Sequence, residues 1–159
     1  MMALRSLHEE GWIDLSRTDT MDTELTAAPD EIRTGLLESS AEYVEVLGPL
    51  VFNHSRLDHA VVGNDDDRDL LERVFGTVHP DVEITAARRQ HKRDAMHIAT
   101  TIRYGLNGFI TNDRQLLSRA DAVKTAFDGF LILSPGAALA ISQRQVNKAR
   151  RRENKKGGT

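Results

Sequence analysis

The chain contains no cysteine among its 159 residues. Structural disulfides, thiolate metal sites and a cysteine nucleophile are therefore excluded, and any metal must be held by oxygen or imidazole. The amino-terminal stretch MMALRSLHEEGWIDL also lacks a long apolar run and carries charges at Arg5, Glu9 and Glu10. It resembles neither a signal peptide nor a membrane span. We therefore expect a cytoplasmic protein without a membrane partner.

The composition is that of a folded domain. Hydrophobic residues make up 40% of the chain and charged residues 28%, which is near the average for globular domains and far from that of disordered chains. The sequence has no internal repeat, and its 159 residues suffice to bury a core. We expect one domain, residues 1–141, followed by a tail.

Positive charge gathers in this tail. The formal net charge of the chain is −3, yet residues 142–159 carry seven basic residues against Glu153 alone. The tail therefore has a net charge of +6, which leaves −9 for residues 1–141. A basic tail on an acidic body suits an electrostatic interaction with nucleic acid. The alternative is a solvated terminus that ends in the flexible residues KKGGT.

Helical and extended patterns alternate along the chain. Apolar spacing predicts helices at residues 3–10, 30–37 and 95–102, and Pro135 suits the first turn of a last helix. A further helix, capped by Thr20 or Asp22, contains Glu24. Short strands are expected at Trp12–Leu15, in the second part of Tyr43–Phe52, at Phe109–Thr111 and at Phe130–Leu133, while Asp81–Thr85 is either a loop or a short strand. This order favours an α/β domain with a parallel sheet.

Three consecutive aspartates, Asp65 to Asp67, follow Asn64. They look like a metal cluster, but consecutive side chains on a helix point about 100° apart and do not converge on one cation. Asn64 is a good capping residue, and negative charge is favourable in the first helical turn. We therefore interpret this run as the start of a helix.

Three other carboxylates are placed better for chemistry. Glu24 follows the predicted strand Trp12–Leu15, Asp113 follows Phe109–Thr111, and Asp94 opens the helix that leads into that second strand. In a parallel sheet, functional residues gather at the carboxyl ends of strands. Clustered oxygens suit Mg²⁺ or Mn²⁺, which activate water and neutralise a phosphodiester transition state. Taken singly, Asp94 and Asp113 could equally be helix-terminal residues that stabilise the helix dipole or cap it.

The stretch RDAMHIATTIRYGLNGFITNDRQLL, residues 93–117, resembles the helix-strand-loop block of PIN domains, a family of metal-dependent ribonucleases. GFLILSPGAAL continues the resemblance. In that family an aspartate opens the helix and a second follows the next strand in a threonine-any-aspartate pattern, and Asp94, Thr111 and Asp113 match these positions. A looser match places Glu24 at the family's glutamate.

The resemblance implies a PIN-like three-layer α/β/α domain with a mainly parallel sheet. It also implies an endoribonuclease that hydrolyses RNA with Mg²⁺ or Mn²⁺. Glu24, Asp94 and Asp113 would be both its catalytic residues and its metal ligands. A toxin of the toxin–antitoxin kind is the narrower expectation, with an antitoxin protein as partner and a homodimer as an oligomeric state.

One feature departs from the family. PIN domains open with a central strand that ends in a ligand aspartate, and nothing before the first predicted helix here supplies it. Asp14 lies too close to Glu24 for that role and is interpreted as structural or solvated. We therefore expect that the first strand is missing and that the chain as given cleaves RNA weakly or not at all. The alternative function is a non-catalytic PIN remnant that binds RNA or a partner protein.

Substrate phosphates are expected near Thr111, Arg93 and Lys92, because a basic run at residues 88–93 precedes Asp94. The alternative for that run is a solvated helix face. His97 lies three residues from Asp94 on the same helical face, but we interpret it as a packed or hydrogen-bonded residue and not as a metal ligand.

Overall fold

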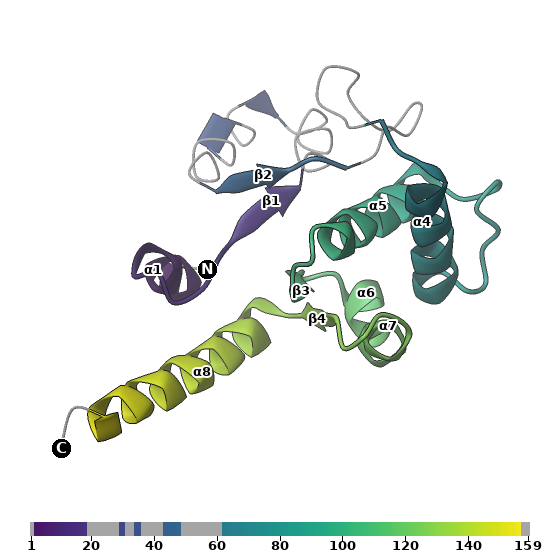
Figure 1. Cartoon of the computed structure of the whole chain (residues 1–159). Helices are drawn as coiled ribbons and strands as arrows, with labels where there is room; N and C mark the ends of the chain where they lie inside the picture. Colours follow the sequence, from purple (N-terminus) through teal and green to yellow (C-terminus); the bar gives the residue numbers. More distant parts are fainter. Residues whose placement is uncertain (1, 19–28, 31–33, 36–42, 49–61, 157–159) are drawn as a thin grey trace.

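A computed structural model of the chain describes residues 2–18, 29–30, 34–35, 43–48 and 62–156, with side chains up to residue 152 (Figure 1). The named helices in these ranges are α1 (Met2–Glu9), α4 (Asp65–Val78), α5 (Arg89–Arg103), α6 (Arg114–Ser118), α7 (Ala120–Ala126) and α8 (Pro135–Lys156). The strands are β1 (Ser16–Thr18), β2 (Val44–Val46), β3 (Gly108–Ile110) and β4 (Leu131–Leu133).

The described strands form two parallel pairs. β1 pairs with β2 so that Ser16 lies opposite Val44, and β3 pairs with β4 so that Gly108 lies opposite Leu131. The second pair extends by one hydrogen bond, from the Thr111 amide to the Leu133 carbonyl at 2.9 Å. The expectation of an α/β protein with parallel strands is confirmed, and the described strands make two separate sheets.

Helix α5 lies against both strand pairs, since it contacts β1 and β3. His97, on α5, shows how. Its Nδ1 is hydrogen-bonded to the Thr18 hydroxyl of β1, and its ring stacks on Phe109 of β3 with centroids 5.7 Å apart. His97 is thus a packed, hydrogen-bonded residue, as the sequence indicated, and it ties the two pairs to one helix.

The largest hydrophobic core lies between α4, α5, the α6–α7 segment and β4. The apolar spacing expected for residues 95–102 is confirmed, because Ala95, Ile98 and Ala99 are buried. They meet residues from α4, α6, α7 and β4 in one cluster, which is Val74, Phe75, Val78, Ala95, Ile98, Ala99, Leu116, Val123, Phe127, Phe130 and Ile132. Burial of this apolar area is the main force that holds α5 in place.

The ends of α4 and α5 are set by local hydrogen bonds. The Asn64 side chain accepts from the Asp67 amide at 2.9 Å and the Asp67 carboxylate accepts from the Asn64 amide at 3.0 Å, which is a capping box. The prediction of a helix start at the aspartate run is confirmed. At the end of α5, Gly105 adopts a positive φ of 67°. The Gly105 and Leu106 amides bond back to the Ile102 and Thr101 carbonyls, a Schellman motif.

Two predicted elements in the amino-terminal half need comment. The strand expected at Trp12–Leu15 is wrong, since β1 begins only at Ser16. His8 explains the shift: its Nδ1 lies 3.0 Å from the Ile13 carbonyl oxygen and 3.3 Å from the Leu15 amide, so this segment turns around the end of α1.

In the stretch 43–52, β2 occupies the first part, and the predicted second part falls outside the described residues, as does the helix expected around Glu24. Residues 81–85 form turns, which matches the loop alternative.

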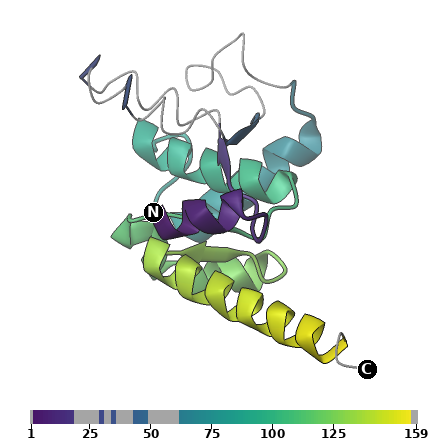
Figure 2. The ribbon, with the colours of Figure 1, turned by 90° about the vertical axis from the view of Figure 1, so that its left-hand side faces the viewer.

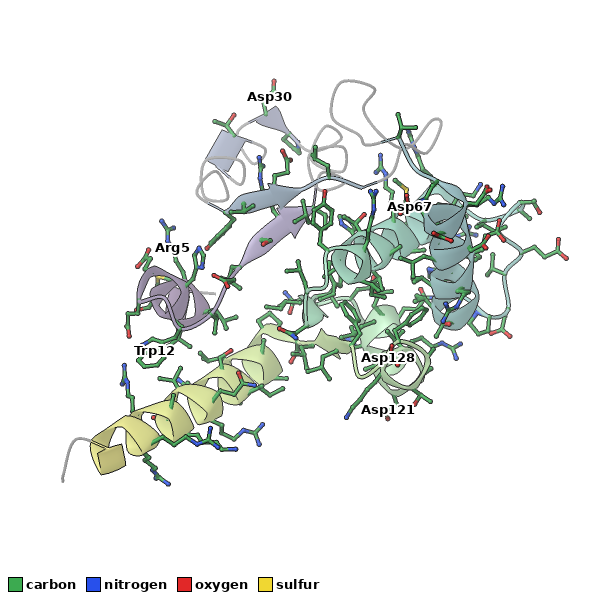
Figure 3. The ribbon with its side chains drawn as sticks, viewed as in Figure 1. Arg5, Trp12, Asp30, Asp67, Asp121 and Asp128 are labelled. Carbon is green, nitrogen blue, oxygen red and sulfur yellow. The ribbon has the colours of Figure 1, made fainter. Side chains whose placement is uncertain are left out.

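Helix α8 begins at Pro135 as expected and continues without a break through residues 141 and 142 to Lys156. Its inner face packs on α1: the Arg150 guanidinium lies 5.0 Å from the centre of the Trp12 ring and 3.4 Å from the Glu10 carboxylate. Figure 2 shows α8 running along α1 to a distant carboxy terminus, and Figure 3 places Trp12 between the two helices. None of the helices in the described ranges is long and apolar enough to cross a membrane.

Gly108 should be required for the β3–β4 pairing. A Cβ at this position would lie 2.6 Å from the Leu131 carbonyl oxygen, closer than real contacts allow. We expect Gly108→Ala to lower the free energy of unfolding by about 1 to 3 kcal/mol, because an overpacked site must shift its backbone. Urea denaturation measures this.

Gly76→Ala is the matched control. Gly76 lies within α4, and a Cβ there would meet nothing within 4 Å. This variant should gain up to about 1 kcal/mol from helix propensity. Equal stabilities of the two variants would contradict the close approach at Gly108.

Candidate functional site

The candidate site lies where the end of α4, the first turns of α5 and the turn after β3 meet. Asp94 and Asp113 are the two predicted ligands that the structure describes, and both act on the buried ring of His79. The His79 Nε2 atom is 3.7 Å from the Asp94 carboxylate. The charge of Asp113 acts on the pKa of His79. Glu24, the third predicted ligand, falls outside the described residues.

Asp94 lies in the second turn of α5 and not at its start, so that part of the sequence interpretation is wrong. The helix begins at Arg89, because residues 89–93 contain no glycine or proline that would delay it. Charge–dipole stabilisation fades within the first turn. The alternative in which Asp94 only stabilises a helix terminus therefore does not hold. Its side chain is 14% exposed, so the carboxylate is largely buried but still reaches solvent.

Asp113 is an N-cap, as the alternative interpretation held. Its Oδ1 atom accepts from the Gln115 amide at 2.7 Å and from the Leu116 amide at 3.2 Å, which starts α6. Its own amide donates to the Thr111 hydroxyl at 3.0 Å. Thr111 therefore shapes the turn that carries Asp113. A carboxylate has about four lone-pair positions on two oxygens, so the cap leaves capacity for a cation.

His79 is the group that sequence reasoning missed. It caps the carboxyl end of α4 and is only 2% exposed. Its ring lies between Phe75, at a centroid distance of 5.3 Å, and His91, at 4.6 Å. Neither ring nitrogen has a hydrogen-bond partner among the described residues. A buried polar group without a partner destabilises the folded state by about 1 to 3 kcal/mol, unless a bound water, ion or ligand supplies the missing contact.

Burial lowers the pKa of His79 below its ordinary value, and the charge of His91 lowers it further. The charge of Arg119 also lowers this pKa, whereas the backbone of His91 and the charge of Asp113 raise it. The ring is therefore neutral near pH 7. Its approach to Asp94 at 3.7 Å is the contact of a carboxylate with a neutral imidazole and not an ion pair.

Of the three residues predicted to contact substrate, only Thr111 is placed at the site by a hydrogen bond. Lys92 lies two residues before Asp94, so their side chains leave α5 about 200° apart and Lys92 points away from the site. Arg93 is about 100° from Asp94 on the helix and is partly buried. Thr111 stays at the site through its bond to the Asp113 amide.

The donors only partly fit the implied Mg²⁺ or Mn²⁺. Two carboxylates beside a pair of imidazoles are suitable ligands for Mn²⁺, while Mg²⁺ prefers oxygen alone. Across the described ranges, no group of three or more histidine, aspartate or glutamate side chains is arranged to hold a metal ion. Glu24, the third residue of the predicted set, lies outside these ranges.

The sequence contained a pattern that could have placed His91 beside Asp94. It precedes Asp94 by three residues, the same spacing at which His97 follows it, but it reaches the site only because α5 starts early. His79 gave no signal, since its place depends on how α4 packs on α5. In comparisons, no protein-family model, curated protein or solved structure matches this chain.

The stability of the protein should depend on pH through His79. Because the pKa of His79 is lower in the folded state than its model value of 6.5, the folded protein binds fewer protons just below pH 6.5 than the unfolded chain. Stability from this group is fully present above that pH and is lost as the pH falls toward the folded pKa. His79→Phe should flatten this loss between pH 7 and 5.

Urea denaturation at several pH values, with a chelator present, measures the effect. Parallel stability curves for the wild type and His79→Phe would contradict it.

Proposed function

We propose that this chain is a metal-dependent endoribonuclease of the PIN type, with Asp94 and Asp113 as ligands of Mg²⁺ or Mn²⁺ and Glu24 as a third. The observation that carries the proposal is that the Asp94 carboxylate lies 3.7 Å from Nε2 of the buried His79 ring, and that the charge of Asp113 also acts on the pKa of this ring. The two carboxylates are 19 residues apart in the sequence, and the fold brings both near this neutral imidazole.

The fold around these residues supports the same proposal. α5 leads into β3, β3 runs parallel to β4, and the chain turns into Asp113 directly after β3. In parallel sheets, ligands bind beyond the carboxyl ends of the strands, where Asp113 lies. The turn begins where the β3–β4 pairing ends, after the hydrogen bond from the Thr111 amide to the Leu133 carbonyl.

The chain's own residues would have distinct tasks in hydrolysis. When bound, a divalent cation activates water and neutralises charge on the phosphodiester. Asp113 is held by its cap and by the turn at Thr111, so its carboxylate needs little reorganisation to serve as a ligand. Asp94 extends from a rigid helix in the core, and its low exposure limits the water that competes for it. Arg93 is the nearer of the two predicted cations for a substrate phosphate.

The narrower proposal is a toxin that an antitoxin protein restrains. Within the described strands, β1 pairs with β2 alone and β3 pairs with β4 alone. Strand edges of this kind favour pairing with another chain. A strand of an antitoxin, or of a second copy in a homodimer, is the partner that this chemistry suits.

A second candidate is a non-catalytic protein that binds RNA. It is favoured by the outer face of α8, where one surface hollow is lined by Arg144, Asn147, Lys148, Arg151 and Arg152. These residues recur every three or four positions, so they share one side of the helix. Binding through this basic face requires no metal.

Metal binding and cleavage together separate the two candidates. We expect the wild type to bind Mn²⁺ and to cleave RNA slowly. Asp94→Asn and Asp113→Asn should each weaken Mn²⁺ binding at least about tenfold, because each removes a charged ligand. Isothermal titration measures the affinity, and a labelled RNA measures the cleavage.

Asp121→Asn is the matched control. Asp121 is an exposed aspartate in the first turn of α7 (Figure 3), and its loss should leave both measurements unchanged. Mn²⁺ binding that Asp94→Asn and Asp113→Asn do not affect would overturn the proposed site. Mn²⁺ binding without any cleavage would favour the non-catalytic candidate.

The basic face of α8 should set the salt dependence of RNA binding. For single strands, each phosphate contact contributes about 0.7 to the slope of log affinity against log salt concentration. Lys148→Gln should lower that slope by about this amount, whereas Lys124→Gln, on the exposed surface of α7, should not. Point variants are preferable to deletion from Lys148, which would also remove the contacts of Arg150 with Glu10 and Trp12. Equal slopes for all three proteins would make this face a solvated surface.

A further inference from the structure

His79 and His91 form a pair of imidazoles beside the carboxylate site. Their ring centroids are 4.6 Å apart, and the ring planes are inclined by 34°. His79 ends α4, and His91 lies in the first turn of α5. The pair is therefore held by two helices that pack together through the core.

Three nitrogens of this pair lack partners. Both nitrogens of His79 and the Nδ1 atom of His91 are buried without a hydrogen bond to any described residue. Buried polar atoms in native proteins nearly always have a partner, so three unpaired nitrogens in one place need an explanation, and a bound ion is one. Packing alone would be served as well by a second phenylalanine beside Phe75.

The carboxylate next to His79 has a role in this arrangement. Its oxygen lies 3.7 Å from the His79 Nε2 atom, so a small movement of either side chain would let Nε2 donate to Asp94. Histidines that bind metals usually donate their other ring N–H to a carboxylate, which fixes the tautomer. The His79 Nδ1 atom would then present its lone pair.

We propose that His79 and His91 form a binding site for a transition-metal cation of the Zn²⁺, Co²⁺ and Ni²⁺ class, with Asp94 orienting His79. Imidazole nitrogen suits these ions, whereas Mg²⁺ prefers oxygen. This site goes beyond the proposed function, because its ligand chemistry differs from that of the carboxylate pair and it does not require RNA cleavage.

The geometry and the charge of the surroundings permit such a cation. Two imidazole nitrogens at about 2.0 to 2.1 Å from one zinc ion are about 3.3 Å apart, a spacing within reach of rings whose centroids are 4.6 Å apart. The Asp94 carboxylate lies 3.7 Å from His79, and the charges of Asp113 and Arg119 act on His79 with opposite signs. Water would supply the remaining ligands, since the pair offers only two.

Cobalt provides a direct test on the full-length chain. Co²⁺ titrated into the metal-free protein should give a saturable visible absorption band at one equivalent. Excess Mg²⁺ should leave the band in place, and Zn²⁺ should remove it. A band that Mg²⁺ displaces would overturn the proposal, since it would mean an oxygen site.

His79→Phe and His91→Phe should each weaken Co²⁺ binding by more than about tenfold, the loss expected when even an outer partner of a metal site is removed. His8→Gln is the control for histidines elsewhere and should keep the band. Circular dichroism checks folding. If His79→Phe does not fold, His91→Phe decides, because His91 is only partly buried. An unchanged band in His91→Phe overturns the site.

The result is separable from the proposed nuclease. Asp113→Asn should lose Mn²⁺-dependent cleavage while it keeps the Co²⁺ band. A Co²⁺ band without cleavage in the wild type supports the imidazole site and contradicts the nuclease. Cleavage that Asp113→Asn abolishes, with no Co²⁺ band in the wild type, supports the nuclease and overturns the imidazole site.

Discussion

The packing of α4 on α5 is the interaction on which the rest of the structure depends. Val74 and Ile98 are completely buried in this contact. It places the end of α4 against the beginning of α5, so His79 meets His91 and Asp94 there. The same helix α5 contacts both strand pairs. A cavity in this core would therefore affect the sheet edges and the polar site together.

The sequence predicted those elements whose signals are local. The cap at Asn64, the apolar spacing of α5 and the proline at the start of α8 each depend on residues within a few positions. The strand before Ser16 was misplaced because the turn around His8 is a contact between side chain and backbone that no hydrophobic pattern encodes. The early start of α5 was missed because the prediction placed the helix start at Asp94, although the arginine, glutamine and lysine residues before it are good helix formers.

The candidate site divides in the same way. Asp94 and Asp113 could be named from their positions near a strand, but their common neighbour could not. His79 comes from a different helix, and only tertiary packing brings it there. For Asp113, the cap is compatible with the proposed ligand role, because the bonds that start α6 also hold its carboxylate in place. The same hydrogen bonds thus stabilise the start of α6 and hold the Asp113 carboxylate in one orientation.

Helix α8 has a mechanical consequence. With 22 residues, it is about 33 Å long at the usual rise per residue. Beyond the midpoint of α8, Arg150 contacts Glu10 and the Trp12 ring, which follow α1 in the chain. The carboxy-terminal segment is therefore a continuous helix held against the rest of the protein, and not a flexible tail. A polyanion that binds the outer face of α8 would therefore also affect the turn that follows α1. His8 connects this turn to the residues directly before β1.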